Sequence, residues 1–543
     1  MRMKALLNGK IYSSKGFYEA VLIENGKIKA LGKNDQIKKM ISAEDEQLDL
    51  NGRLVLPGFI DSHAHGPFSL SKMVDRIDLY SEDTEEGYIE IVRKFVEENP
   101  DKEVYSGMGW INPAFDKLGP DKKSLDRVCS DKPVILQSGD GHSVWGNSRA
   151  IELAGVSAET PDPEGGTIER DTDGSPRGAF REQAQDMLRD LIPEPTIEEY
   201  KKSIMLFQDM MASYGHTAVF DPMVDLDSNM LEAYRELDRE GMLKIKFGLA
   251  YLSAPENPEL LLERCREIPR FNSGKLIEGT FVKVFVDGVV EGGTAYLKEA
   301  YCNRPGYFGE ALWSQDKLNR FCEAVDKAGY DIHFHVIGDA AVKQMIDAMD
   351  HVKKANGERL RNTVAAHMQI VDVNDYEKLK ELDIRISSNP YWFVKAPGYY
   401  EDIELPSLGD RAEREYPMKA FFDMGLTVSA GSDFAVTPEP FPMRGIQLAM
   451  LRTIEIDEHN APQNILGAEE SIDFEQGLEA FTANGSKTMG IDGLTGVIEV
   501  GKCADLAVME QNVLEMEPWE LEKPCVYMTF SDGEMIYCRN QDE

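Results

Sequence analysis

Two histidines separated by one residue, His63 and His65, follow a short apolar run, Phe59-Ile60, near the start of the chain. In an extended backbone, residues two apart point to the same side, so both imidazoles can reach one metal ion. Imidazole is a common ligand of Zn²⁺ and of other borderline divalent ions. The pattern indicates a metal site, although two hydrogen-bonded structural histidines at a strand end would fit the same spacing.

Five further candidate ligands lie in, or at the ends of, later apolar runs. They are Lys283, His333, His335, His367 and Asp433. If these runs are parallel strands, their carboxyl ends meet at one mouth, and we expect the side chains to converge there. Asp433 can also accept a proton from a metal-bound water molecule. Spacing does not decide between His333 and His335, because residues two apart share a face.

Lys283 is the least usual member of this set, because it lies between apolar neighbours in its run. A surface or salt-bridged lysine is the alternative interpretation. Burying a lysine in a core strand is costly unless the residue has a special role. Four neighbours of the strand ends have supporting roles in our interpretation: Asp61 orients neighbouring backbone, Asp287 braces a loop, and Tyr391 and Trp392 face the mouth.

The runs that carry these residues alternate with helical patterns along the chain. The eight runs are 54–60, 217–220, 245–250, 281–286, 332–337, 363–366, 384–387 and 427–430. Helical patterns with charged faces lie at 198–213, 315–328 and 373–381. Alternation of strand and helix predicts a parallel sheet, and eight units predict an α/β fold of the (β/α)8 TIM-barrel type.

The rest of the chain is assigned to a second domain and an insertion. Residues 1–58 and 489–543 both read as short strands joined by turns, and neither end alone has enough strands for a two-layer core. They are predicted to form one composite β-sandwich. The barrel domain, 59–488, exceeds the roughly 250 residues that a barrel needs. An insertion after the first strand, about 66–214, with β-prone runs at 104–108 and 134–137, is expected to lie over the mouth.

Composition excludes several classes of function. The 59 Lys and Arg against 96 Asp and Glu give a net charge of −37, which repels nucleic acid and anionic lipid. No apolar stretch approaches the roughly 18 residues of a membrane span, and the N-terminus lacks a signal-peptide core. The seven scattered cysteines suit reduced thiols. We therefore expect a cytoplasmic enzyme with a small-molecule substrate. The oligomeric state is open, and a homodimer is the commonest state for such enzymes.

Several longer strings resemble those of a known family. They are GDGHSVWGNSRAI (139–151), KVFVDG (283–288), HFHVIGDAAV (333–342), GSDFAV (431–436) and GLTGVIEVGKCADLAVME (493–510). Together with the HxH strand they resemble the amidohydrolase superfamily, in its amidohydrolase family 3 branch of YtcJ-like proteins and N-substituted formamide deformylases. The match extends over nearly the whole chain.

The resemblance implies a ligand set and a second group of site residues. One metal would be held by His63, His65 and Asp433, and a second by His335 and His367. Lys283 would bridge them after CO₂ converts it to a carbamate, because an ammonium has no lone pair to give. The metals are expected to be two Zn²⁺, with Mn²⁺, Fe²⁺ or Co²⁺ as alternatives. The insertion residues His142, Trp145 and Asn147 would line or cover the substrate pocket.

The function implied is hydrolysis of an amide, N-formyl or N-acyl carbon–nitrogen bond by metal-activated hydroxide, with Asp433 as proton carrier. A deaminase of the same superfamily would generally use one metal without the bridging lysine. An ester or lactone hydrolase needs the same machinery. An inactive barrel that serves as a binding or scaffold protein requires loss of ligands, and here none of the six is missing.

Overall fold

The computed structural model describes residues 3–71, 74–139, 142–163, 165–253, 258–265, 271–456, 462–522 and 526–539. The chain divides into two compact units. The first comprises Met1–Gly66 and Met205–Glu543, and the second comprises Pro67–Ile204. Each unit has its own sheets and its own apolar clusters.

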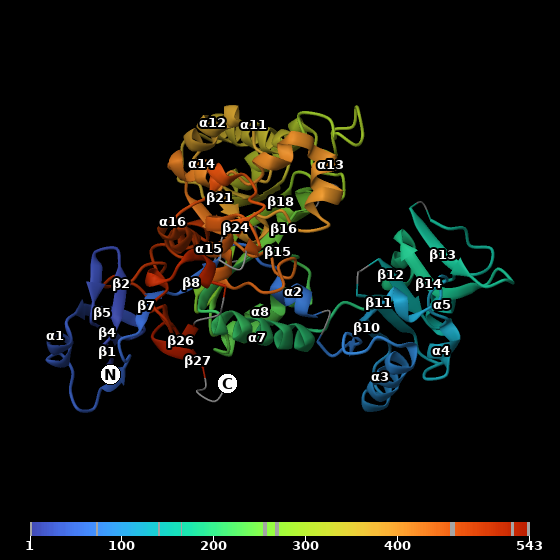
Figure 1. Ribbon diagram of the computed structural model, residues 1–543, viewed down its shortest axis with the longest axis horizontal. Helices are drawn as coiled ribbons and strands as arrows, with labels where there is room; N and C mark the ends of the chain where they lie inside the picture. The colour runs from blue at the N-terminus through green and yellow to red at the C-terminus, as the bar shows by residue number, and fades with distance from the viewer. Residues whose placement is uncertain are drawn as a thin grey trace. The chain divides into compact units, whose positions relative to one another are not determined.

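The first unit is built on a row of eight parallel strands (Figure 1). In pairing order they are β8 (Phe59–Asp61), β15 (His216–Val224), β16 (Lys246–Leu252), β18 (Leu276–Phe285), β19 (Asp331–Val336), β20 (Val364–His367), β21 (Arg385–Ser388) and β22 (Val428–Ala430); β17 (Phe271–Ser273) adds an antiparallel partner to β18. The two ends of the row meet where the Ser62 amide donates to the Ala430 carbonyl at 3.0 Å. The predicted TIM barrel is confirmed, because each predicted run overlaps one barrel strand.

Helices lie between the barrel strands along the chain and after the last of them. They include α7 (Ile197–Ser213), α8 (Asn229–Arg239), α9 (Pro258–Cys265), α10 (Gln315–Lys327), α11 (Asp339–Asn356), α12 (Tyr376–Glu381), α14 (Met418–Asp423), α15 (Pro442–Leu451), α16 (Phe474–Ala480) and α17 (Ala483–Thr488). In α10 the buried Leu318, Phe321, Cys322 and Val325 follow the helical period of apolar residues that predicts such a helix. No helix in the described residues is both long and apolar enough to cross a membrane.

Both ends of the chain build a two-layer sandwich in the first unit. One sheet has the order β5 (Lys27–Gly32), β4 (Ala20–Glu24), β1 (Lys4–Leu7), β6 (Glu46–Asp49), and the other has β27 (Glu534–Cys538), β26 (Val526–Ser531), β25 (Leu506–Met509), β7 (Leu54–Pro57), β2 (Lys10–Ser13), β3 (Gly16–Tyr18). Leu6 and Val21 of one sheet share an apolar core with Val55 and Leu506 of the other. Figure 1 shows blue N-terminal β7 near red C-terminal β26, as the sequence predicts.

The predicted run 54–60 was wrong in one respect, because it forms two strands in different sheets. β7 belongs to the sandwich and β8 to the barrel, and Gly58 separates them. The Gly58 amide donates to the Asp505 carbonyl at 2.9 Å, and the next amide donates to the Gly215 carbonyl at 3.0 Å. A Cβ at Gly58 would lie 2.3 Å from Thr217 Oγ1, so a glycine lets the strand change partners here.

The second unit follows the first barrel strand, as the predicted insertion does. Its sheet has the order β13 (Gly166–Arg170), β14 (Pro176–Glu182), β12 (Ser143–Gly146), β11 (Val134–Ser138), β10 (Tyr105–Trp110), β9 (Ile77–Asp78). Its helices include α3 (Glu85–Glu98), α4 (Lys122–Asp126), α5 (Ser148–Leu153) and α6 (Asp186–Arg189). The β-prone runs 104–108 and 134–137 form most of β10 and β11. A position of this unit over the barrel mouth stays a prediction.

Candidate active site

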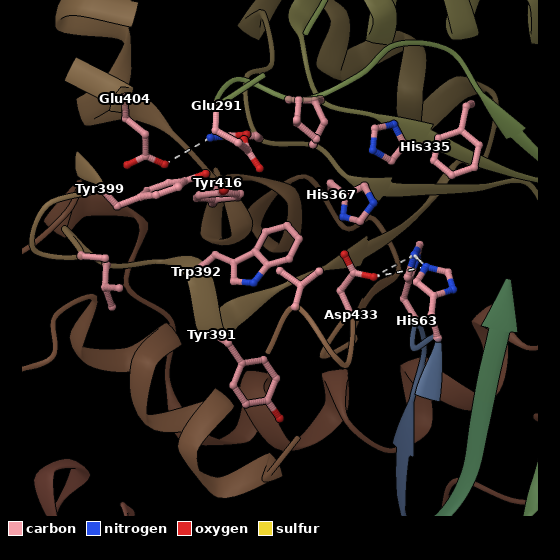
Figure 2. A pocket seen from close by; sticks show the side chains of 18 of the residues that line it. His63, Glu291, His335, His367, Tyr391, Trp392, Tyr399, Glu404, Tyr416 and Asp433 are labelled. Carbon is pink, nitrogen blue, oxygen red and sulfur yellow. Dashed lines mark hydrogen bonds and ion pairs between the residues drawn. The ribbon is translucent and has the colours of Figure 1, made fainter. Parts of the chain in front are cut away.

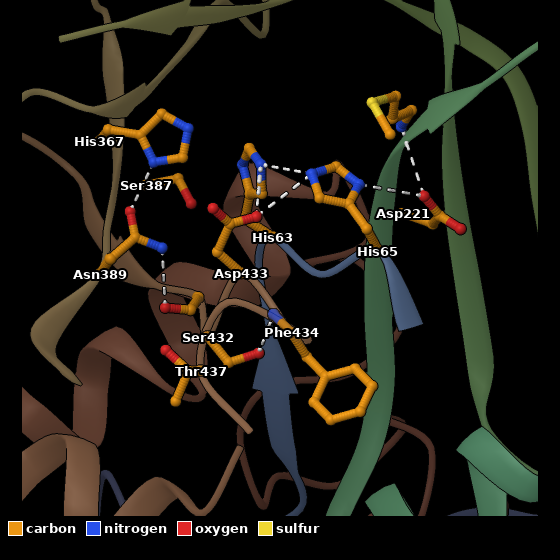
Figure 3. Close-up of polar contacts among 12 residues, drawn as sticks. His63, His65, Asp221, His367, Ser387, Asn389, Ser432, Asp433, Phe434 and Thr437 are labelled. Atoms are coloured by element: carbon orange, nitrogen blue, oxygen red, sulfur yellow. Dashed lines mark hydrogen bonds and ion pairs between the residues drawn. The ribbon is translucent and has the colours of Figure 1, made fainter. Parts of the chain in front are cut away.

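His63 and His65 lie just beyond the end of β8, and their imidazoles face one another (Figure 3). The two Nε2 atoms are 3.2 Å apart. Asp61 fixes the backbone that carries them, because its Oδ1 accepts the His63 amide at 3.0 Å and the Ser432 amide at 3.1 Å. These bonds give Asp61 the orienting role expected of it, and they tie the first barrel strand to the segment after the last.

Asp433 follows β22, the last strand of the barrel, and its carboxylate lies beside the imidazoles of His63 and His65. Its backbone is left-handed, with φ 54°, and its amide donates to the His63 carbonyl at 2.7 Å. Oδ1 lies 3.2 Å from His65 Nε2 and 3.6 Å from His63 Nε2. Burial alone would raise the pKa of Asp433, but contact with His65 and the neighbouring positive charge lower this pKa to about 2. The carboxylate is therefore ionised at neutral pH.

His335 and His367, on β19 and β20, form the opposite part of the centre. Their ring centroids are 4.6 Å apart. Asn389 Oδ1 lies 2.8 Å from His367 Nδ1, and Asp287 Oδ1 lies 3.6 Å from His335 Nδ1. Burial lowers the pKa of each histidine to about 3, helped by Lys283 at His335 and by the neighbouring histidine at His367. Both imidazoles are neutral at neutral pH and keep a lone pair.

His333 lies behind the centre and not in it. Its side chain is fully buried, its Nε2 is 3.0 Å from His63 Nδ1, and its ring packs edge-on against Phe220. His335, in contrast, lines the barrel cavity. The structure therefore favours His335 as the ligand of the fifth strand, and gives His333 the position of a group that orients the His63 ring.

Lys283 is buried in the barrel interior at zero exposure, which overturns the surface alternative. Its Nζ lies 3.5 Å from His63 Nε2 and 4.8 Å from the centroid of the Phe285 ring. No carboxylate of the described residues forms an ion pair with Lys283. Burial lowers the pKa of Lys283 to about 7, although the charges of Asp433 and Asp221 act in the opposite direction. A substantial fraction of this amine is uncharged at neutral pH.

The donor chemistry of this centre fits a divalent metal ion. Ligand atoms of His63, His65 and Asp433 all lie within 4.8 Å of one another. Burial keeps the pKa of His63 well below its ordinary value, so its nitrogen is free to bind a cation. Asp433 Oδ1 is buried and accepts no hydrogen bond from the described residues. Neutral imidazole and an ionised, unsatisfied carboxylate oxygen are the ligands that Zn²⁺ and similar ions prefer.

A cavity of about 500 Å³ extends from this centre (Figure 2). The described residues that line it all belong to the first unit. Tyr391 and Trp392 are among them, as their position after the seventh strand predicts. The Trp392 ring stacks on His367 at an interplanar angle of 14°, and its Nε1 donates to Thr437 Oγ1 at 3.2 Å. Trp392 therefore forms a wall beside the reacting end of the cavity.

The three predicted site residues of the insertion lie in the second unit. Asn147 is fully buried; its side chain caps α5 by accepting the Ala150 amide and donates to the carbonyls of Cys129 and Lys132. Trp145 is also fully buried, and its Nε1 donates to a main-chain carbonyl. His142 is exposed, with Nδ1 3.1 Å from Glu182 Oε2. These contacts give Trp145 and Asn147 structural roles in their own unit, and contact of the three with substrate stays a prediction.

Several residues at the site were not found from the sequence. Asp221, in β15, has Oδ1 3.7 Å from His65 Nδ1, and contact with Asp221 and Asp433 raises the pKa of His65 against the effect of burial. Asn389 holds His367 and donates to the Gly431 carbonyl at 3.1 Å. Both are polar residues near the carboxyl ends of barrel strands, which is the signal that could have identified them.

Comparison with known proteins agrees with this geometry. Residues 46–537 match the model of the Amidohydrolase family. The chain is 27% identical over 529 residues to YtcJ of Bacillus subtilis (strain 168), covering 96% of each protein. It is 25% identical over 537 residues to an N-substituted formamide deformylase of Arthrobacter pascens, covering 96% of this chain and 95% of that one. A metal-dependent hydrolase of uncharacterized function from Pyrococcus furiosus superimposes with a TM-score of 0.77 at 26% identity, covering 94% of this chain and 100% of that one.

Proposed function

The chain belongs to the amidohydrolase family, and we propose that it hydrolyses an amide, N-formyl or N-acyl bond of a small molecule at the centre around Asp433. It is a metal-dependent hydrolase of carbon–nitrogen bonds. One observation carries the proposal: histidines, a buried lysine and an ionised aspartate from several barrel strands converge at one end of a cavity large enough for a small molecule.

The proposed ligand assignment follows the two sides of the centre. His63, His65 and Asp433 would hold one ion, and His335 and His367 a second. Two Zn²⁺ per chain are proposed, with Mn²⁺, Fe²⁺ or Co²⁺ as alternatives, because such a ligand set accepts all four. When bound, the ions would lower the pKa of a water molecule and polarise the substrate carbonyl.

Lys283 is proposed to be a carbamate that bridges the two ions. Its lowered pKa supports this, because only the uncharged amine has the lone pair that attacks CO₂. The new N–C bond releases one proton and leaves a carboxylate on Nζ. Conversion of this buried amine into an anion would add a second negative charge to that of Asp433 for binding cations.

Asp433 is proposed to carry the proton. Its Oδ1 faces His65 and accepts no hydrogen bond from the described residues, so it is free to take a proton from the attacking water. An amide nitrogen leaves only after protonation, and the same carboxyl group can supply that proton. The buried Asp61 and Asn389 hold the two sides of the centre in place through backbone and imidazole bonds.

Metal content is the measurement that tests the centre. Protein purified without chelator, in bicarbonate, is expected to hold close to two divalent ions per chain by elemental mass spectrometry. One ion would favour the deaminase-type site, and none after metal reconstitution would favour the inactive binding barrel. N-formyl and N-acyl compounds are then screened beside esters and lactones. Cytoplasmic location and a homodimer stay predictions.

A further inference from the structure

The cavity has a second polar end, across Trp392 and Tyr416 from Asp433 (Figure 2). We call it the distal end and define it by Glu291, Tyr399 and Glu404. Glu404 is the last residue of the π-helical turn η5 (Tyr400–Glu404), and Glu291 lies in the segment after β18. The cavity therefore joins a metal-binding centre to a pair of carboxyl groups.

Glu404 is buried yet poorly satisfied. It is 3% exposed, and its Oε1 receives one long bond, 3.5 Å from Gln369 Nε2. Oε2 has no hydrogen-bond partner in the described part of the chain. Burial, together with the charge of Glu291, raises the pKa of Glu404 to about 8. A buried carboxyl group that lines a cavity with an unused oxygen has room for a ligand donor.

A third carboxyl group, that of Glu415, lies behind Glu404, and burial together with Glu404 raises the pKa of Glu415 well above its ordinary value, so ionisation of the cluster requires a cation beside it. Glu415 is fully buried; its Oε1 is 2.5 Å from Gln369 Nε2, and its Oε2 has no hydrogen-bond partner among the described residues. Among the described residues no lysine or arginine forms an ion pair with Glu291, Glu404 or Glu415. The guanidinium of Arg452 bonds to the main-chain carbonyls of Glu415 and Tyr416 and not to a carboxylate.

Two other buried acids of the same unit differ in this respect. Asp505 pairs with Lys246 at 2.8 Å, and the Asp326 carboxylate accepts bonds from Arg359 and Arg361. An unpaired acid in a protein interior either stays protonated, as the raised pKa of Glu404 indicates, or ionises when a cation arrives from outside. The distal end thus lacks the cation that the chain supplies to Asp505 and Asp326.

Aromatic rings complete a site for a cation. Burial and the charge of the nearby Glu291 raise the pKa of the Tyr399 hydroxyl, and Tyr416 and Trp392 line the cavity between the two ends. Aromatic faces attract ammonium and guanidinium groups. The net charge of −37 attracts cations toward the protein as well.

We propose that the substrate carries a positively charged group, an ammonium in the simplest case, that binds between Glu404 and Glu291 while the scissile bond lies at Asp433. This inference rests on the proposed function and names its substrate class: amides whose apolar chain ends in a cation. The apolar chain of such a substrate would pass the rings of Trp392 and Tyr416 on its way from one end of the cavity to the other.

Direct binding tests the distal end without turnover. Hexylamine, which is charged at neutral pH, and hexan-1-ol, its neutral counterpart, are titrated into metal-loaded protein by calorimetry. The amine is expected to bind at least about 30-fold more tightly than the alcohol, because the alcohol lacks one partner of the buried charge pair. Equal binding of the two compounds would overturn the proposal.

Two variants locate the preference. Glu404→Gln and Glu291→Gln are expected to reduce the ratio of amine to alcohol affinity toward one, and exposed Glu291 provides the change least able to disturb folding. Glu401→Gln, in the same turn but exposed and outside the cavity, is the matched control and should keep the ratio. A full preference in both cavity variants would also overturn the proposal.

Turnover separates this inference from the proposed function. N-formyl-1,5-diaminopentane and N-formylhexylamine have the same chain length, and only the first ends in an ammonium. A kcat/KM at least about 30-fold higher for the charged compound is expected, again from one buried charge pair. Hydrolysis of both at equal rates would retain the hydrolase and reject the cation site. Hydrolysis of neither, with amine binding intact, would reject the amide chemistry and retain the site.

Discussion

The described residues of the first unit contain two groups of three potential metal ligands within reach of one ion, and these groups differ in what their carboxylates contact. His63, His65 and Asp433 form one group; Cys503, Asp505 and Asp532 form the other. In the second group Lys246 Nζ lies 2.8 Å from Asp505 and 2.9 Å from Asp532. In the first group the carboxylate faces the imidazoles of His63 and His65 and has no lysine or arginine partner among the described residues.

The difference shows that ligand type and spacing do not by themselves make a metal site. A lysine already supplies the positive charge at Asp505, so a divalent ion there would have to displace a buried ion pair. Among the described residues, only histidines form ion-pair contacts with Asp433. Its Oδ1 accepts no hydrogen bond from these residues and keeps an unused lone pair. The first group is prepared for an external cation, and the second links barrel strand β16 to the sandwich.

The largest effect is expected from Asp433→Asn. An amide cannot carry a proton from water to a leaving nitrogen, so kcat for an N-formyl substrate should fall by about 10²- to 10⁴-fold. Circular dichroism should show an unchanged fold. Asp410→Asn, at an exposed aspartate, is the control. Near-normal turnover in the Asp433 variant would remove the proton-carrying role.

Lys283→Ala tests the bridge between the two ions. Metal content should fall by about half or more, because the carbamate can no longer form, and a short carboxylic acid such as propionate should restore part of it. Elemental mass spectrometry with and without propionate measures both effects. Unchanged metal content in this variant would show that Lys283 is not a ligand.

Asp505→Asn is expected to act on stability and not on metal. Asp505 and Lys246 are almost fully buried, and breaking such a pair costs about 3 kcal/mol. The urea midpoint of unfolding should therefore fall while metal content stays at the wild-type value. Loss of metal here would erase the distinction between the two groups.

The smallest effect concerns pH. Burial opposes ionisation of Asp532, but Lys246 and Lys275 hold its pKa well below the ordinary value. A lowered folded-state pKa gives stability that is present above the unfolded pKa of about 3.9 and lost as pH falls through the folded value. Below about pH 4, the thermal midpoint should therefore fall more steeply in wild type than in Asp532→Asn. Parallel curves would show that this ion pair contributes nothing.

The barrel could be predicted from the sequence because its strands are short apolar runs separated by helical patterns. The split of 54–60 into β7 and β8 could not, because both halves are apolar and the change of partner depends on space at Gly58 beside Thr217. A hydrophobic pattern indicates that a segment is buried, but it does not indicate to which sheet the segment belongs.

The centre could be predicted for the same reason, since parallel strands bring their carboxyl ends together. The distal end could not. Glu404 ends a π-helical turn and Glu415 lies outside helix and strand, both after the seventh strand, where no sequence period predicts the direction of a side chain. Asn147 shows the reverse case: the Asn-Ser step before an apolar helical run is typical of a helix cap, and the resemblance gave it a substrate role instead.

The pairing of β7 with β25 sets a condition on how the protein is made. β7 leads through Gly58 directly into the strand that carries His63 and His65. Its antiparallel neighbour, residues 506–509, follows all eight barrel strands along the chain, so β7 must hold an unpaired edge on that side until the barrel sequence has been made. Such edges favour aggregation. The sandwich, and with it the anchorage of the segment that leads to His63 and His65, is therefore completed only after every barrel strand has been synthesised.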